Sequence, residues 1–434
     1  MTSQRPREPD LPRRRHRCGV AAVGVLGLLA GLLTGCSSGG GVDTAPSASA
    51  IRTFLAAHAA ALRAHDRSTF LAGLSRAKPS AGLVRTQSAA YDNLVQLPLS
   101  SWSYQLGIRT DDTAAEKSAT ARYGRAAEIR KVTLHYALRG YDLKPTSHDL
   151  YWTFIQQDGE VRLAGDSDLA DAGGASWKGP WDFGPLVIGR GASTLVIAHA
   201  SAGDLSTLVA QVDAAVPAVT AVWGAHWPRR VVVLVPASAD ELSADAGQSS
   251  DLTTDVPAAT VSDMVDPLTR AAVGLRLLIN PPALAKLSAP GRQITLRHEI
   301  THIATGAVTS DSSPRWLVEG FADYVGLLHS GQSPTQAAVE LTRDVRAGSL
   351  PKALPTETTF DEASTSPQAY EEGWLACRLL AHDRGQAGLV RFYRAVGASY
   401  DPQHAVQTAL KAEYGMTLEQ FTAAWRAYLK RELG

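Results

Sequence analysis

Leu296-Arg297-His298-Glu299-Ile300-Thr301-His302-Ile303 is the stretch of this 434-residue sequence that decides most about its fold and its chemistry. On an α-helix, residues four positions apart lie on one face, so the imidazoles of His298 and His302 are placed to bind one metal ion. Glu299 then points into the adjacent position. Zinc suits two nitrogen ligands and one oxygen ligand, with a water in the open fourth place. The pattern His-Glu-x-x-His is short enough to arise by chance, so it needs support from the surrounding sequence.

The next predicted helix, over residues 313–325, supplies a carboxylate for this site. Its sequence is Ser-Pro-Arg-Trp-Leu-Val-Glu-Gly-Phe-Ala-Asp-Tyr-Val, in which Ser313 is suited to cap the helix and Pro314 to its first turn. Glu319 follows His302 by 17 residues, which leaves room for a helix end, a loop and a return. We therefore expect Glu319 to provide the third ligand.

Asp323 lies one helical turn beyond Glu319 and hence on the same face. Its carboxylate is placed to accept a hydrogen bond from the non-ligating nitrogen of a zinc-bound histidine, and we expect that histidine to be His298. One helix then delivers both a metal ligand and the group that orients another ligand. A site that uses Asp311 or Asp323 as its third ligand is the alternative.

His-Glu-x-x-His followed by Trp-Leu-x-Glu-Gly-x-Ala-Asp-Tyr resembles the gluzincins, the branch of zinc metallopeptidases that includes thermolysin. The resemblance covers about residues 190–434, and its central positions are matched by the five residues named above, His298, Glu299, His302, Glu319 and Asp323. It implies a zincin-like fold and a zinc cofactor that lowers the pKa of its bound water. It also implies that Glu299 takes the proton of that water and passes it to the leaving amine.

Other classes of hydrolase fit the sequence poorly. The metzincin pattern needs a glycine and a third histidine where Thr305 and Val308 stand. The Gly-x-Met-Glu-Asn segment with which the aminopeptidase branch binds a free amino terminus has no counterpart before His298. No serine elbow of the Gly-x-Ser-x-Gly kind is present either. Metal chemistry is the route that the sequence supports, and aminopeptidase activity is not implied.

Two further segments are candidates for contact with a peptide substrate. Enzymes of the family that this sequence resembles add a tyrosine or histidine donor for the developing oxyanion, and Tyr370 in Ala-Tyr-Glu-Glu-Gly-Trp is the candidate here. A packed core tyrosine is the alternative. The apolar run over 275–280, Leu-Arg-Leu-Leu-Ile-Asn, fits either an edge strand that pairs with an extended peptide or, as we expect, an ordinary interior strand.

The N-terminus has the composition of an export signal. Four arginines between positions 13 and 17 precede an uncharged apolar run over 19–33, which is short for a membrane-spanning helix. The run ends in Leu33-Thr34-Gly35-Cys36, which resembles the lipobox of bacterial lipoproteins, where the acylated cysteine becomes the first residue. We therefore expect residues 1–35 to be removed and Cys36 to anchor the protein to the outer face of the cell membrane. An ordinary cleaved signal peptide and an uncleaved anchor helix are the alternatives.

Charge and cysteine content argue against two classes of protein. The sequence has 42 basic and 42 acidic residues, and no cluster of Lys and Arg occurs outside the N-terminus, so we expect no nucleic-acid partner. Of the three cysteines, Cys18 lies in the predicted signal peptide and Cys36 would carry lipid. Cys377 is then the only other thiol, which excludes a disulfide framework within one chain.

Two segments precede the predicted zinc domain. Residues 36–50 are small and polar, as in a flexible linker. Over 51–170, apolar residues at helical spacing are followed by short strands, among them 131–136 and a hairpin whose turn is Asp158-Gly159. This order resembles the cone-shaped nuclear-transport-factor-like fold, which serves in binding or dimerisation. A spacer domain with no ligand is the alternative.

The second half of the chain begins after a segment rich in Gly, Trp and Pro over 172–191, which predicts a boundary. A strand near 193–197, an Ala-rich helix near 204–224 and a valine-rich strand near 230–235 predict a mixed sheet with a helix packed on it. From Gln293 onward the pattern is helical. The expected fold is α+β, with a small domain of helix plus antiparallel sheet and then a zincin-like domain over 190–434.

These observations predict an exported, lipid-anchored zinc peptidase that hydrolyses a peptide or protein substrate at the cell envelope. The alternative is an envelope lipoprotein that acts as a binding module and whose zinc site is structural or degenerate.

Overall fold

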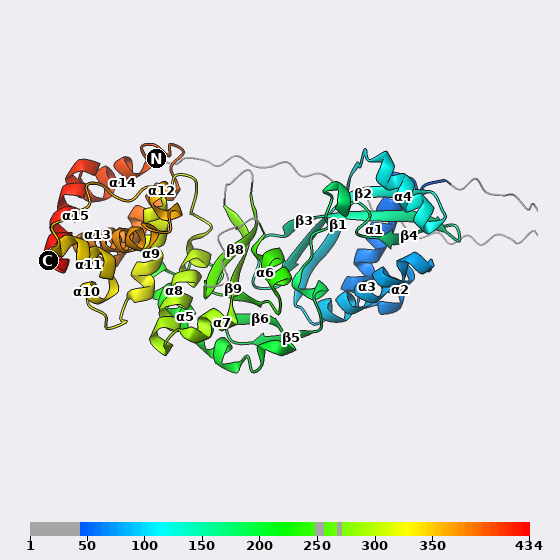
Figure 1. Cartoon of the computed structure of the whole chain (residues 1–434), viewed down its shortest axis with the longest axis horizontal. Helices are drawn as coiled ribbons and strands as arrows, with labels where there is room; N and C mark the ends of the chain where they lie inside the picture. The colour runs from blue at the N-terminus through cyan, green and yellow to red at the C-terminus, as the bar shows by residue number, and fades with distance from the viewer. Residues whose placement is uncertain (1–43, 248–255, 267–270) are drawn as a thin grey trace, which may run out of the picture. The chain divides into compact units, whose positions relative to one another are not determined.

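The computed structural model describes residues 44–247, 256–266 and 271–434 (Figure 1). Cys36 and the predicted signal peptide over 1–35 lie outside the described residues, as does most of the predicted linker over 36–50. The described residues are α+β, with an antiparallel sheet, a mixed sheet and a helical C-terminal half, which confirms the predicted fold class.

The first sheet is a four-stranded antiparallel meander in the order β1-β2-β3-β4. Its strands are β1 Leu99–Arg109, β2 Ala127–Leu138, β3 Thr146–Gln157 and β4 Glu160–Gly165. The helices before and within this sheet are α1 Ala48–Arg63, α2 Arg67–Ala72, α3 Ala81–Leu94 and α4 Thr113–Tyr123. The helical pattern predicted at the start of the 51–170 segment is broken between α1 and α2 at His65, whose φ is +56°, and Asp66 caps α2 by accepting a hydrogen bond from Thr69 N–H.

The hairpin predicted around Asp158-Gly159 is present and joins β3 to β4. Both turn residues have positive φ, +54° for Asp158 and +80° for Gly159, as a two-residue hairpin turn that follows the strand twist requires. The short strand predicted over 131–136 is part of β2.

The second sheet is mixed, as predicted, and has the order β5-β6-β7-β9-β8. Its strands are β5 Leu186–Arg190, β6 Thr194–His199, β7 Val231–Val235, β8 Ala258–Val265 and β9 Ala272–Ile279. β6, β7 and β9 run parallel, whereas β5 and β8 run antiparallel to their neighbours. All five residues of β7 are buried, which explains its run of valines. The 275–280 segment lies mostly in β9, an interior strand, so the expectation of an interior strand is confirmed and the edge position belongs to β8.

Helices form the rest of the chain. The four that lead to the predicted zinc ligands are α5 Ser206–Trp223, α6 Ala239–Ala246, α7 Pro281–Lys286 and α8 Ala289–Thr305. They are followed by α9 Arg315–Leu327, α10 Pro334–Ala337, α11 Val339–Arg346, α12 Glu357–Asp361, α13 Ser366–Gly397, α14 Ala405–Tyr414 and α15 Leu418–Leu433. Among the described helices, α5 alone is long and apolar enough to cross a membrane, but its face with Val212, Val216 and Val219 packs into the core beside α8.

The first turns of α9 and α15 differ in how they are capped. Ser313 does not cap α9, because Pro314 occupies the capping position and the Ser313 hydroxyl accepts a hydrogen bond from Ser310 N–H instead. The loop therefore uses this serine to stabilise its own turn. Thr417 and Gln420 form a capping box at the start of α15.

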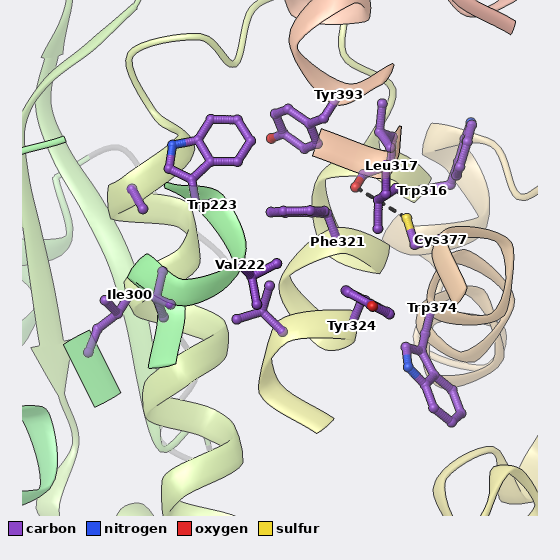
Figure 2. Packing of buried hydrophobic residues seen from close by; sticks show 14 of the residues in the cluster. Val222, Trp223, Ile300, Trp316, Leu317, Phe321, Tyr324, Trp374, Cys377 and Tyr393 are labelled. Atoms are coloured by element: carbon purple, nitrogen blue, oxygen red, sulfur yellow. Dashed lines mark hydrogen bonds between the residues drawn. The ribbon is translucent and has the colours of Figure 1, made fainter. Parts of the chain in front are cut away.

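The core behind α9 is aromatic (Figure 2). Phe321 lies between Trp223 and Tyr393, with ring centroids 5.6 and 5.0 Å away. Cys377, on α13, is completely buried and its thiol faces the Leu317 carbonyl at 3.9 Å. These contacts hold α9 between α5, which carries Trp223, and α13, which carries Cys377 and Tyr393.

Two glycines allow α9 and α13 to approach closely. A Cβ added to Gly320 would lie 2.2 Å from the Gly373 carbonyl oxygen, and one added to Gly373 would lie 2.6 Å from the Trp316 carbonyl oxygen. Both distances are far below van der Waals contact, so any side chain here forces the backbones apart. Because Gly320 directly follows Glu319, this close contact between α9 and α13 also determines where Glu319 lies relative to α13.

A buried ion pair joins the two sheets. Arg276 on β9 is 3 % exposed, and its guanidinium donates to both oxygens of Asp142, in the β2–β3 loop, at 2.6 and 3.0 Å. Asp263 on β8 lies 3.5 Å from the same guanidinium and accepts a hydrogen bond from the Tyr136 hydroxyl at 3.2 Å. One hydrophobic cluster also contains residues of both sheets, among them Trp102 and Leu278. The first sheet is therefore packed onto the sheet that carries the candidate site.

Candidate metal centre

Two helices place the predicted zinc ligands together. His298 and His302 lie one turn apart on α8, and Glu319 lies in the second turn of α9. The Nε2 atoms of the two histidines are 3.1 Å apart, and Glu319 Oε2 lies 3.3 Å from the first and 3.4 Å from the second. Within the described part of the chain, this is the one group of His, Cys, Asp or Glu residues with metal-ligand spacing. It contains neither Asp311 nor Asp323, the alternative third ligands.

The spacing of the three atoms fits a tetrahedral metal site. Zinc bonds to imidazole nitrogen and carboxylate oxygen at about 2.0–2.2 Å, so the edges of the tetrahedron are about 3.3–3.6 Å long. The three observed separations, 3.1, 3.3 and 3.4 Å, match such edges closely. Two imidazole nitrogens and one carboxylate oxygen are donors that suit zinc, whereas magnesium and calcium prefer oxygen donors. The residues present therefore fit zinc.

Asp323 fixes the orientation of one ligand. Its Oδ1 lies 2.7 Å from His298 Nδ1, which leaves His298 Nε2 directed at Glu319 and His302. Burial alone would lower the pKa of His298, but the charge and hydrogen bond of Asp323 outweigh burial and raise this pKa well above its usual value. The same field favours a metal cation at Nε2 in place of a proton.

The Glu319 carboxylate is held in its charged form. Burial acts to raise its pKa, but the charges and hydrogen bonds of His302 and His298 lower it far below the usual value. The other oxygen of this carboxylate, Oε1, lies 4.0 Å from the guanidinium of Arg315. Arg315 also pairs with Asp361 at 2.8 Å and lies over the Phe360 ring, 5.0 Å from its centroid. Arg315 lies in the helix sequence quoted above, but no pattern around it signals its place beside Glu319.

Glu299 faces the same cleft and is hydrogen-bonded to the edge strand. The Thr260 hydroxyl, on β8, lies 2.9 Å from Glu299 Oε2 and 2.8 Å from the Glu299 carbonyl oxygen. It can donate its single proton to one of them at a time. Sequence reasoning missed Thr260, because no pattern around it signals which strand lies beside α8.

Tyr370 reaches the site from α13. Its ring centroid is 6.4 Å from that of His298, and the ring packs edge-on against Phe360 at 5.2 Å. Burial, followed by the charge of Glu319, raises the pKa of Tyr370 to about 12, although the neighbouring Arg315 acts in the opposite direction. The hydroxyl therefore keeps its proton at neutral pH and remains a hydrogen-bond donor.

A cleft of about 580 Å³ contains these groups and is called the metal cleft below. One wall is strand β8, and the other carries the three metal-ligand candidates, Glu299 and Tyr370. Asp311 also lines the cleft, outside the ligand group. Among the described strands, β8 pairs with β9 alone, and its residues 258–262 line the cleft. The arrangement combines three candidate metal ligands, the Glu299 carboxylate and strand β8 in one opening.

Comparison with known proteins gives little beyond this geometry. No protein-family model and no curated protein matches the chain. Three similar solved structures are mutants of M1 zinc metallopeptidases, two of them from Deinococcus radiodurans.

The first of these Deinococcus structures is 16 % identical with a TM-score of 0.35, and the match covers 75 % of this chain and 61 % of that one. A two-domain enzyme bound to L-arginine is 16 % identical with a TM-score of 0.33, covering 63 % and 58 % of the two chains. The second Deinococcus structure, bound to a Tyr-Ser-Ala substrate, is 16 % identical with a TM-score of 0.34, covering 75 % and 69 %. The chain thus spans about three-fifths of the length of the first two. Its own residues carry the functional argument.

Proposed function

We propose that this protein is a zinc-dependent peptidase, with His298, His302 and Glu319 as the zinc ligands and Glu299 as the catalytic base. One observation carries the proposal. The three candidate ligand atoms converge at tetrahedral spacing in a cleft that is also lined by Glu299 and by β8, a terminal strand among those described. A purely structural zinc site is closed by four protein ligands, whereas a site with three protein ligands leaves a position for water.

When bound, zinc supplies a water of lowered pKa and polarises the carbonyl group of the substrate. The chain's own residues do the rest. Glu299 takes the proton from the attacking water and later gives it to the leaving nitrogen. When its hydroxyl donates to Glu299 Oε2, Thr260 holds this carboxylate in one orientation. Asp323 fixes His298 in the tautomer that leaves Nε2 free to ligate.

The substrate is proposed to be an extended peptide or a protein segment. Strand β8 offers main-chain donors and acceptors along its outer edge, with which an extended peptide can pair as an added strand. Tyr370, whose hydroxyl stays protonated at neutral pH, is the proposed donor to the developing oxyanion. The alternative, that Tyr370 is only a packed core residue, is tested by the variant Tyr370→Phe. That variant should lower kcat while leaving the zinc content and the melting temperature unchanged.

The proposed place of action is the outer face of the cell membrane, with lipid on Cys36. This part of the proposal rests on the basic residues, the apolar run and Leu33-Thr34-Gly35-Cys36. Membrane fractionation and mass spectrometry of the natural protein, beside a Cys36→Ser variant, test it. An unmodified N-terminal fragment that contains Cys36 would contradict lipidation.

A peptide-library cleavage assay beside metal analysis tests the enzyme. The expected result is one zinc per chain in the purified protein, cleavage of library peptides, and loss of both zinc and cleavage in His298→Ala. A protein that binds zinc but cleaves no peptide would support the rival function, an envelope binding module with a structural zinc site. Five residues with zincin-type placement favour the enzyme, because a purely structural site does not need Glu299.

A further inference from the structure

The first sheet encloses a second hollow, of about 530 Å³, which is called the aromatic cavity below. It lies among β1–β4, α3 and the segment around η3 Pro180–Asp182. Seven aromatic side chains line it, namely Phe70, Trp102, Tyr104, Tyr123, Trp152, Trp177 and Trp181. Its volume is that of a pocket for a small organic molecule. The proposed peptidase chemistry does not use any of these residues.

The aromatic rings are fixed by one another. Trp181 packs edge-on against Trp102 and Trp177, with centroids 5.5 and 5.6 Å apart. Tyr104 packs against Trp152 at 5.0 Å, and Trp177 stacks on His148 at 3.5 Å. Each ring is thus held by a neighbour rather than free to collapse into the hollow, and the cavity is preorganised.

A buried asparagine holds one wall in place. The Asn93 side chain, which is 3 % exposed, donates to the Trp181 and Gly184 carbonyl oxygens at 2.9 and 2.8 Å. Its own oxygen accepts from Leu186 N–H at 3.0 Å. All three contacts tie the segment over 181–186 to α3. The positions of Trp181 and of its neighbour Asp182 are therefore set by a fully bonded buried group.

Within the part of the chain that the structure describes, no basic side chain forms an ion pair with Asp166 or Asp182, two carboxylates that line the aromatic cavity. Among the described residues, the hydrogen bond made by the Asp182 carboxylate is the one it accepts from Gly179 N–H at 2.9 Å. Burial, followed by the neighbouring charge of Asp166, raises the pKa of Asp182 to about 7. Burial also raises the pKa of Asp166. Both carboxylates therefore lie in an apolar setting without full compensation.

The basic residues at the cavity do not neutralise this pair. Arg122 is already bonded to Asp168 at 2.6 Å, and Asp168 also accepts from Tyr123 and Thr153. Lys178 is exposed at the rim, and its charge lowers the pKa of Asp166 and Asp182 without overcoming their burial. The balance inside the cavity is therefore negative, and it disfavours an anionic ligand.

We infer that the aromatic cavity is a binding site for a small organic cation, an amine or quaternary ammonium compound with an apolar body. The faces of Trp and Tyr attract such cations, and a desolvated carboxylate supplies the counter-charge. The apolar body of the ligand would fill the remaining volume between the rings. The site is separate from the metal cleft, and this inference does not depend on the proposed peptidase activity.

The test compares two ligands of nearly equal shape on the purified protein by isothermal titration calorimetry. The probes are 2-phenylethylamine, which is charged at neutral pH, and 2-phenylethanol, which is not, with benzyltrimethylammonium as a quaternary probe. The amine should bind at one site per chain, at least about tenfold more tightly than the alcohol, because a hydrogen bond to a charged group adds about 1.5–3 kcal/mol.

The variant Asp182→Asn keeps the shape of the side chain and the acceptor for Gly179 N–H, but removes the charge. It should weaken binding of the amine about tenfold or more and leave binding of the alcohol unchanged. Asp171→Asn, which removes an equal charge from an exposed position near the cavity, should bind the amine like the wild type.

Three outcomes would overturn the inference. Equal affinity for amine and alcohol would show that charge is not recognised. Tighter binding of the alcohol would show that a protonated Asp182 recognises neutral ligands. Failure of both cationic probes to bind the wild-type protein would show that the cavity takes no organic cation. The comparison on the wild type stands even when Asp182→Asn does not fold.

Discussion

The metal cleft and the aromatic cavity are hollows of similar size, about 580 and 530 Å³, yet their carboxylates are in opposite states. In the cleft, two histidines hold the pKa of Glu319 far below its usual value despite burial. In the cavity, burial and then the charge of Asp166 raise the pKa of Asp182, which has one backbone donor, to about 7. The same kind of side chain is thus held in its charged form between two histidines in the metal cleft and has no cationic side chain paired with it, among the described residues, in the aromatic cavity. Neighbouring groups, rather than burial, decide which.

The largest effect that we expect is on the rate of the peptide hydrolysis proposed for the metal cleft. Glu299→Gln should lower kcat by about 10²–10⁴-fold, the range for loss of a general base, while zinc content stays at one per chain. Metal analysis and peptide cleavage on the same sample would show it. Full activity in this variant would leave the metal cleft without its proposed base.

The second effect concerns the packing that sets the depth of Glu319. Gly320→Ala would place a Cβ 2.2 Å from the Gly373 carbonyl oxygen, so α9 and α13 must separate. The free energy of unfolding should fall by about 1–3 kcal/mol, and zinc affinity should fall with it. Gly82→Ala, a helical position with no atom within 4 Å of the added Cβ, is the matched control and should not destabilise. Equal stability of the two variants would contradict the close contact.

The third effect separates a metal ligand from the group that orients it. Asp323→Asn should weaken zinc binding about 10–100-fold without abolishing it, because the His298 ring loses its charged partner but keeps its place. Competition with a zinc chelator measures this. The exposed pair of His404 and Asp401 supplies a control, since Asp401→Asn should leave zinc affinity unchanged. Complete loss of zinc from Asp323→Asn would instead suggest that Asp323 is a ligand.

The fourth effect tests the state of Asp182 through pH. Because the pKa of this carboxyl in the folded protein, about 7, lies above its usual value of 3.8, the folded state holds the proton more tightly. The resulting stability is present below pH 4 and is lost as the pH rises through 7. The stability of Asp182→Asn relative to wild type should therefore rise by up to about 4 kcal/mol between pH 4 and pH 8. Urea unfolding at several pH values measures it, and a flat difference would show that Asp182 is already charged.

The smallest effect concerns the hydroxyl that holds Glu299. Thr260→Val should lower kcat/KM by up to about tenfold, the value of one hydrogen bond. Thr260→Ser keeps the hydroxyl and should retain most of the activity. If valine and serine behave alike, the contact at 2.9 Å has no role in catalysis.

The two hollows also differ in how far the sequence alone predicts them. The metal ligands occur as His-Glu-x-x-His and as Glu319 with Asp323 one turn later, so helix geometry alone relates the groups within each segment. Thr260 is different, because its place beside Glu299 depends on the order of strands in the sheet. The aromatic cavity is even harder to predict from the sequence than the position of Thr260, because its walls come from segments that meet only in the folded protein. The predicted cap at Ser313 was wrong for a local reason, a turn that uses the same hydroxyl.

The ion pair between Arg276 and Asp142 has a consequence for how this protein can evolve. Recombination that joined the second sheet to a different partner would remove the bidentate acceptor of the Arg276 guanidinium, which is 3 % exposed, and leave it with Asp263 on β8 at 3.5 Å. Loss of one partner of such a pair costs about 3–5 kcal/mol, comparable to much of the stability of a domain. The two sheets are therefore expected to be inherited together, and a change at either residue should be tolerated only with a compensating change at the other.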